Sequence, residues 1–213
     1  MIKRFIKAFI VSSIMIILPV LGNLEMLRSP QLLILLIIGI IASIFQPDYR
    51  IVVDKSNSRD NNTEIQIIWS VYIILLLTIC EATYLRFPES VYWNIFTTVS
   101  LIAIILGLVL RSWAIYTLGK FFTMNLSIQN NHRIICTGPY KYLRHPSYLG
   151  AFFVYIGIPI FLHSWFSLLV AAVILPMAWF RRIHYEEKML IEEFGEEYLS
   201  YCKSVKRIIP GLW

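Results

Sequence analysis

The sequence YLGAFFVYIGIPIFLHSWFSLLVAAVILPMAWF, residues 148–180, decides the fold. It consists of two apolar runs, residues 148–162 and 165–180, separated only by His163 and Ser164. Such runs are typical of helices in a membrane, where a spanning helix needs about 20 residues. A two-residue connection leaves room only for a tight turn, so we expect two helices packed as an antiparallel hairpin.

The rest of the chain shares this apolar character. Of its 213 residues, 58% are hydrophobic and only 15% are charged, whereas a soluble domain has roughly 25% charged residues. Four more apolar runs precede the hairpin, at residues 5–21, 32–45, 65–85 and 91–116. We predict an all-α, polytopic integral membrane protein with about six transmembrane helices. The first run follows basic residues, as in a signal peptide, but no small-residue cleavage pattern comes after it; if it were cleaved, five helices would remain.

The distribution of basic residues predicts the orientation. With the N-terminus in the cytoplasm and six crossings, every Lys and Arg except Arg28 and Arg86 falls on the cytoplasmic side. This asymmetry follows the positive-inside rule of membrane proteins. It places both termini and the polar residues 131–148 in the cytoplasm. It also explains the net charge of +6 without nucleic-acid binding.

A polar stretch, NHRIICTGPYKYLRHPSY at residues 131–148, stands directly before the hairpin. Gly138-Pro139 predicts a turn, because proline fixes φ and glycine frees it. Pro146 is suited to the first position of the next helix. The free N–H groups at a helix start favour a carboxylate or phosphate, and Arg144 and His145 add donors there. From these residues alone, the stretch is either a binding site or an interfacial connector.

Beyond the hairpin, residues 181–201 have apolar side chains at helical spacing and glutamates on the opposite face. This pattern predicts an amphipathic helix that leaves the membrane, with a possible interruption at Gly195. Arg182 and Glu186 are four positions apart and therefore share a face. They form either a surface ion pair or part of a site, and ionisable residues at a membrane boundary favour the second interpretation.

Several other polar residues receive a simple structural interpretation. Glu81, near the outer end of one apolar run, is expected to snorkel to the membrane surface, and His163 and His184 are expected at the interface. The three cysteines have neither metal nor redox spacing, so no metal site is predicted. The sequence also has no Walker loop, G-x-G-x-x-G or H-E-x-x-H motif.

Three ordered blocks, LGKFF (118–122), HRIICTGPYKYLRHPSYLG (132–150) and EEKMLIEEFGEEYLSY (186–201), resemble the isoprenylcysteine carboxyl methyltransferase family. This family belongs to a wider membrane methyltransferase superfamily that includes phospholipid N-methyltransferases. The resemblance rests on R-H-P-x-Y-x-G and F-G-x-x-Y and covers residues 118–210. It divides the chain into N-terminal transmembrane helices, residues 1–117, and a motif region, residues 118–213, in which the hairpin and a cytoplasmic C-terminal helix form one structural unit.

The resemblance implies a methyltransferase that uses S-adenosyl-L-methionine in a cytoplasmic pocket. It implies catalytic roles for Arg182, which would bind the substrate carboxylate, and for Glu186, which would bind the cofactor. The choice of Glu186 over Glu187 rests on an ungapped count back from Phe194 and Gly195. The implied cofactor contacts are His132, Arg133, Ile134, Ile135, Tyr140, His145, Pro146, Ser147, Tyr148 and Glu186.

The implied acceptor is a lipid or lipidated molecule that enters from the membrane and carries an isoprenylcysteine-like carboxylate. Such a carboxylate is ionised at neutral pH and needs no general base. N-methylation of an ethanolamine phospholipid is the alternative, and its amine would need a base such as Glu187 or His184. An NADPH-dependent membrane reductase and a scaffold without cofactor are alternatives of other classes. We expect no nucleic acid and no metal among the partners.

Overall fold

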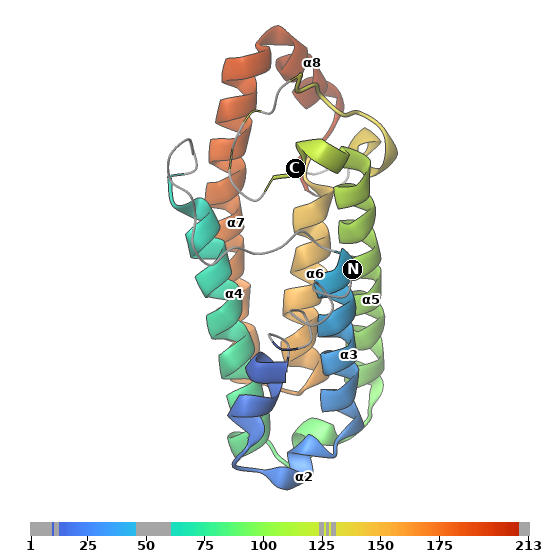
Figure 1. The fold of residues 1–213 in the computed structure, drawn as a ribbon, viewed down its shortest axis with the longest axis vertical. Helices are drawn as coiled ribbons and strands as arrows, with labels where there is room; N and C mark the ends of the chain where they lie inside the picture. The colour runs from blue at the N-terminus through green and yellow to red at the C-terminus, as the bar shows by residue number, and fades with distance from the viewer. Residues whose placement is uncertain are drawn as a thin grey trace.

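The computed structural model describes residues 10, 13–45, 61–123, 126, 128 and 131–208. In this part of the chain the regular elements are all helical, and five long helices lie side by side in an elongated bundle (Figure 1). The short helices α2 (Leu24–Leu27) and α8 (Glu196–Ser204) lie at opposite ends of the bundle. The long helices are α3 (Pro30–Phe45), α4 (Thr63–Cys80), α5 (Ile95–Leu118), α6 (Pro146–Phe161) and α7 (Trp165–Phe194).

The all-helical prediction is confirmed, and the chain has the helices of an integral membrane protein. Among the described residues, three helices are long and apolar enough to span a membrane, at Thr63–Leu85, Ile95–Phe121 and Trp165–Phe194. Two shorter apolar helices, Pro30–Ser43 and Pro146–Phe161, accompany them. Of the first predicted run, residues 5–21, the structure describes residues 10 and 13–21, which include the 3-10 helix η1 (Leu18–Val20).

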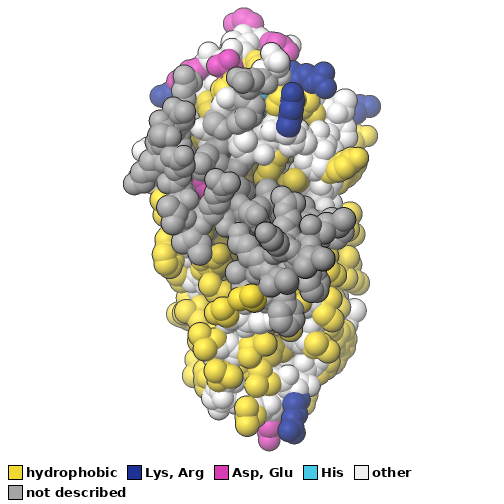
Figure 2. All heavy atoms as spheres, viewed as in Figure 1, with side chains coloured by type: hydrophobic (Ala, Val, Ile, Leu, Met, Phe, Trp, Pro, Cys, Tyr) yellow, Lys and Arg dark blue, Asp and Glu magenta, His cyan; other side chains and the backbone are white. Residues whose placement is uncertain are grey.

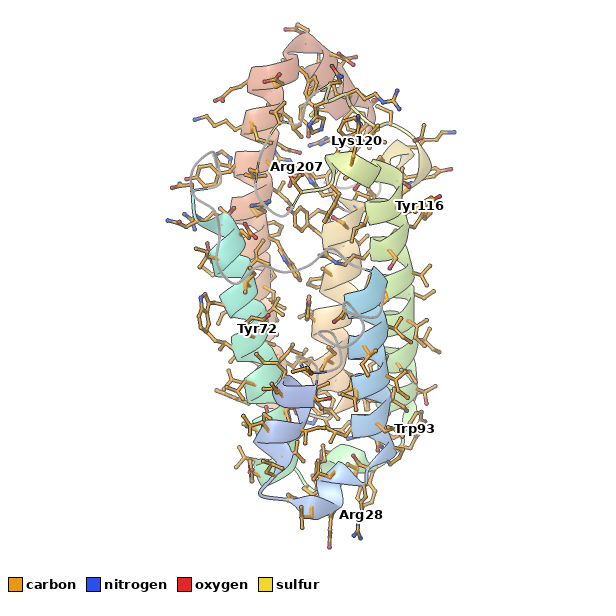
Figure 3. All side chains as sticks on the ribbon, viewed as in Figure 1. Arg28, Tyr72, Trp93, Tyr116, Lys120 and Arg207 are labelled. Carbon is orange, nitrogen blue, oxygen red and sulfur yellow. The ribbon has the colours of Figure 1, made fainter. Side chains whose placement is uncertain are left out.

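Charged and apolar surfaces separate along the bundle. On the face seen in Figure 2, the described charged side chains gather at the two ends, and hydrophobic side chains lie between them. Arg28 marks one end, whereas Lys120 and Arg207 lie toward the other (Figure 3). The 30 residues of α7 correspond to about 45 Å at 1.5 Å per residue, which exceeds the roughly 30 Å hydrocarbon core. The polar last turns of α7 therefore project from the membrane toward α8.

Glycines allow α5 and α6 to pack closely. A Cβ added at Gly107 would lie 2.6 Å from the carbonyl oxygen of Gly150, and one added at Gly157 would lie 2.6 Å from Cγ1 of Ile104. Small residues at a helix interface let backbones approach in a membrane, where association depends on close van der Waals contact. The Gly150 that ends the R-H-P-x-Y-x-G motif is thus a packing residue.

The structure corrects the interpretation of Glu81. This residue begins a π-helical segment, Glu81–Leu85, that continues α4, and its side chain is buried. Its carboxylate accepts hydrogen bonds from the backbone N–H groups of Phe166 and Ser167, at 3.0 and 2.7 Å, and from the Ser167 hydroxyl at 2.7 Å. A negative charge stabilises the N-terminus of a helix. Glu81 therefore caps α7 rather than snorkelling to the surface.

His163 is also buried. It occupies the three-residue turn, residues 162–164, between α6 and α7 with φ of +50°, which confirms the tight hairpin. Its Nδ1 lies 2.9 Å from the Glu89 carbonyl oxygen, and its Nε2 lies 3.2 Å from Oγ1 of Thr97. These contacts tie the turn of the hairpin to the start of α5.

Removal of the Glu81 cap is expected to destabilise the bundle. In Glu81→Ala, two N–H groups of α7 and the Ser167 hydroxyl lose their acceptor in a buried site. The expected decrease in the free energy of unfolding is about 2 kcal/mol or more, measured by equilibrium unfolding in mixed micelles. Glu25→Ala removes an exposed carboxylate and serves as the control. Equal stability of the two variants would contradict the capping role.

Candidate active site

A cavity opens at the end of the bundle that carries α8, among α4, α5, α6, α7 and the chain that precedes α6. Its volume is about 1250 Å³, including the space open to solvent. Among the residues predicted from sequence, Pro146 alone is not in the lining; it begins α6. The others, which all line the cavity, are His132, Arg133, Ile134, Ile135, Tyr140, His145, Ser147, Tyr148, Arg182 and Glu186.

The chain before α6 folds as its Gly and Pro residues predict. Gly138 has φ of +57° and starts a 3-10 turn, Gly138–Lys141. A Cβ there would come within 2.9 Å of Oγ1 of Thr117, so glycine is required by both conformation and space. The Tyr201 hydroxyl donates a 2.6 Å hydrogen bond to the carbonyl of Tyr140. The turn is therefore fixed against α5 on one side and α8 on the other.

Tyr148 connects the two predicted catalytic residues. Its hydroxyl donates to Oε2 of Glu186 at 2.9 Å and accepts from Nε of Arg182 at 3.2 Å. Nη1 of Arg182 lies 3.0 Å from Oγ1 of Thr63, at the start of α4. Arg182 is only 4% exposed, so its guanidinium is held in one orientation between α4, α6 and α7.

Glu187 faces away from the cavity lining and holds a charged network behind it. Its Oε1 accepts from Nε of Arg144 at 2.8 Å and lies 3.2 Å from Nε2 of His145. Its Oε2 accepts from Nε of Arg207 at 2.8 Å. Burial raises the pKa of Glu187, but the hydrogen bonds and charges of His145 and Arg144 outweigh it and hold the pKa at about 2. Of the two adjacent glutamates, the structure thus directs Glu186 into the cavity and Glu187 into this network.

His132 lies between two aromatic rings. It stacks on Phe121, with ring centroids 4.8 Å apart and planes at 15°, and meets Phe194 edge-on at 5.6 Å. Burial lowers the pKa of His132, partly opposed by the charge of Glu193. A neutral imidazole is therefore favoured at pH 7, which gives the cavity one N–H donor and one acceptor there. All three rings line the cavity.

The structure adds Arg111 to the site, a residue for which the sequence predicts only a cytoplasmic position. Arg111 is 7% exposed, lines the cavity from α5 and donates from Nη1 to the carbonyl of Ser147 at 3.1 Å. A Cβ at Gly150 would lie 2.8 Å from its backbone nitrogen. The signal was its position inside an apolar run, where an ionisable residue is functional by default.

Glu64 and an apolar section of the cavity were also missed. Glu64 is 3% exposed and lines the cavity from the first turn of α4. Glu64 directly precedes the predicted apolar run that begins at residue 65. Because glutamate is common in the first turn of a helix, this position does not by itself indicate a site. Farther along α4, α6 and α7, the lining becomes apolar, with Ile67, Val71, Ala151, Tyr155 and Trp179. The cavity therefore joins a charged section to an apolar one.

The two residues considered as bases for an amine acceptor do not line the cavity. His184 is exposed on α7 and lies outside it, and Glu187 is engaged by its cationic neighbours. Within the described ranges, no group of three or more His, Cys, Asp or Glu side chains could hold a metal ion. The charged groups that the cavity does present are suited to binding a carboxylate and an ammonium group.

Residues 98–192 match the model of the isoprenylcysteine carboxyl methyltransferase (ICMT) family. An Oryza sativa subsp. indica protein, "Probable protein-S-isoprenylcysteine O-methyltransferase", is 30% identical over 161 residues, which cover 72% of this chain and 84% of that protein. The protein-S-isoprenylcysteine O-methyltransferase of Saccharomyces cerevisiae is 35% identical over 126 residues, 58% of this chain and 53% of that one.

A solved structure supports the same relationship. The eukaryotic intramembrane Ras methyltransferase ICMT aligns with a TM-score of 0.63 and 26% sequence identity. The alignment covers 85% of this chain but only 65% of that protein. The chain therefore corresponds to slightly less than two thirds of the solved relative.

The Glu187 network predicts acid sensitivity. Because the pKa of Glu187 is about 2 in the folded protein and 4.5 as a reference, the unfolded state takes up this proton first as pH falls. The stability from this group is present above about pH 4.5 and is lost from there toward pH 2. We expect Glu187→Gln to be less stable than wild type near neutral pH and to lose less stability on acidification, measured as unfolding midpoints. Parallel pH curves for wild type and Glu187→Gln would contradict this, and the exposed Glu196→Gln controls for the loss of a charge.

Proposed function

The chain belongs to the isoprenylcysteine carboxyl methyltransferase family, and we propose that it methylates the carboxylate of an isoprenylcysteine-like, lipid-linked acceptor with S-adenosyl-L-methionine as methyl donor. The observation that carries the proposal is one cavity with a charged section and an apolar section. The charged section suits the donor and the acceptor carboxylate, and the apolar section suits the lipid. This cavity is built largely from the stretch that matches the family model.

The donor set of the cavity fits S-adenosylmethionine, whose amino-acid part carries an ammonium and a carboxylate. Glu186 offers a carboxylate to the ammonium, while His145 and the first turn of α6 offer donors to the carboxylate. Bound there, the donor supplies an electrophilic methyl group on a sulfonium sulfur.

The remaining predicted residues would shape the donor side of the cavity. Arg144 adds a cation beside His145, and Pro146 acts indirectly, by starting α6. We assign contact with the donor to the lining residues His132, Arg133, Ile134, Ile135, Tyr140, His145, Ser147, Tyr148 and Glu186.

Arg182 would hold the acceptor carboxylate. A carboxylate is already ionised at neutral pH, so the protein need only align and desolvate it. The guanidinium can bind it through two N–H groups, and Tyr148 and Thr63 fix the orientation of Arg182. This arrangement favours a carboxylate over an amine as acceptor, because the proposed bases for an amine do not line the cavity.

We further propose that the lipid part enters sideways between α4, α6 and α7. The apolar lining of the cavity extends along these helices toward their membrane-spanning parts. The distribution of Lys and Arg supports six crossings with both termini and the cavity in the cytoplasm. In the proposed division of the chain, residues 118–213 carry most of the site, and α4 and α5 from residues 1–117 complete it.

The proposal predicts separable effects of Arg182→Ala and Glu186→Gln on methyl transfer. We expect each to reduce kcat/KM on the order of 100-fold. Arg182→Ala should act mainly on the acceptor and Glu186→Gln mainly on the donor KM. The measurement is transfer of labelled methyl from S-adenosylmethionine to a farnesylcysteine analogue, with phosphatidylethanolamine assayed in parallel.

Neighbouring residues provide matched controls for this assay. Arg181 is exposed and donates to the carbonyl of Asn61 outside the cavity, and Glu196 is exposed on α8. Arg181→Gln and Glu196→Gln should retain wild-type transfer. Labelling of phosphatidylethanolamine without labelling of the cysteine analogue would contradict the proposed acceptor, and full activity of Arg182→Ala would contradict the proposed site.

A further inference from the structure

The segment after α8, residues 205–207, runs beside the R-H-P motif; we call it the strap. Leu143 and Lys206 form a parallel β-bridge. The backbone N–H of Arg144 donates to the carbonyl of Lys206 at 2.8 Å, and that of His145 donates to the carbonyl of Arg207 at 2.9 Å. The strap therefore accepts the hydrogen bonds of the two backbone N–H groups directly before α6. It fixes the position of the chain where α6 begins, beside the cavity.

Side chains reinforce this backbone pairing. Nη1 of Arg144 donates a hydrogen bond to the carbonyl oxygen of Cys202 at 3.1 Å. It also donates to the carbonyl oxygen of Val205. Arg207 reaches back from the strap, and its Nε and Nη2 each lie 2.8 Å from Oε2 of Glu187. Figure 3 labels Arg207 at this end of the bundle. The strap is thus joined to α7 as well as to the motif.

The carboxylate of Glu187 divides its oxygens between the motif and the strap. Oε1 faces Arg144 and His145, and Oε2 faces Arg207. Contact with Glu187 directs Nε2 of His145 away from the cavity, while Nδ1 lies 4.0 Å from Oε2 of Glu186 in the lining. The orientation of the His145 ring therefore depends on where Glu187 is held.

We infer that Arg207 is a positioning residue for methyl-donor binding, which acts through Glu187 to hold Arg144 and His145 in place. This inference rests on the proposed function. Arg207 lies outside the cavity lining, so it is not a catalytic residue. Without Arg207, Oε2 of the buried carboxylate loses its cation, and Glu187 is free to turn toward Arg144 and change the position of both motif side chains.

The test is donor affinity, measured by calorimetry with S-adenosylmethionine on the full chain in detergent micelles. We expect Arg207→Gln to raise the donor Kd on the order of ten-fold, as for loss of a charged hydrogen bond, with the acceptor KM unchanged. Lys203→Gln, which removes an exposed cation of α8, should leave the donor Kd at the wild-type value. A donor Kd within two-fold of wild type in Arg207→Gln would overturn the inference.

A double-mutant cycle tests whether Arg207 acts through Glu187. If it does, the Glu187→Gln/Arg207→Gln pair should bind the donor no more weakly than Glu187→Gln alone. If the increase in donor Kd of the double variant equalled the product of the increases in the two single variants, the inference would be overturned.

A conservative variant keeps the test decisive if Arg207→Gln does not fold. Arg207→Lys retains the charge but cannot supply both N–H contacts, so we expect a smaller loss of donor affinity, roughly three-fold. An unchanged donor Kd in Arg207→Lys would then contradict the inference. Donor binding by the wild type separates the two proposals: its absence overturns the proposed function, whereas normal binding in both wild type and Arg207 variants overturns only the positioning role.

Discussion

The buried carboxylate of Glu187 joins three stretches that are far apart in the sequence. Arg144 and His145 precede α6, Glu187 stands on the projecting part of α7, and Arg207 follows α8. A buried carboxylate is stable only with its hydrogen bonds and counter-charges in place. The shape of the cavity beside Arg144 and His145 depends on this requirement, because the R-H-P motif cannot move without breaking the network.

The membrane imposes the second constraint. In hydrocarbon the backbone must satisfy its own hydrogen bonds, so the spanning elements are helices, and irregular backbone is confined to the ends or to protein-covered sites. The polar residues between α5 and α6 accordingly lie at one end of the bundle. Close packing of α5 on α6 at Gly107 and Gly150 then brings Arg111 to the same cavity. Packing within the membrane and chemistry at its surface are thereby linked.

Much of this arrangement could be predicted from the sequence. Apolar runs predicted the helices, Gly138 and Pro146 predicted the turn and the helix start, and helical spacing put Arg182 and Glu186 on one face. These inferences succeed because they depend on local backbone preferences and on periodicity. The motif resemblance selected residues that the fold brings together around one cavity, with Pro146 alone outside its lining.

Other features could not be predicted, because they depend on contacts between distant segments. The apolar surroundings of Glu81 suggested snorkelling, whereas its partner is the start of a helix 85 positions later. Arg111 looked like one topology marker among many until α6 was placed against it. The role of Glu187 required the position of the strap, which no periodicity encodes.

In the proposed function, residues 131–148 and the projecting part of α7 together form a single methyl-donor site. Photo-cross-linking of labelled S-adenosylmethionine to the purified protein, followed by peptide mapping, tests this claim most directly. We predict that the label is found in peptides from residues 131–148 and 182–198 and is displaced by S-adenosylhomocysteine. Displaceable label confined to the opposite end of the bundle, around Arg28 and α2, would contradict it.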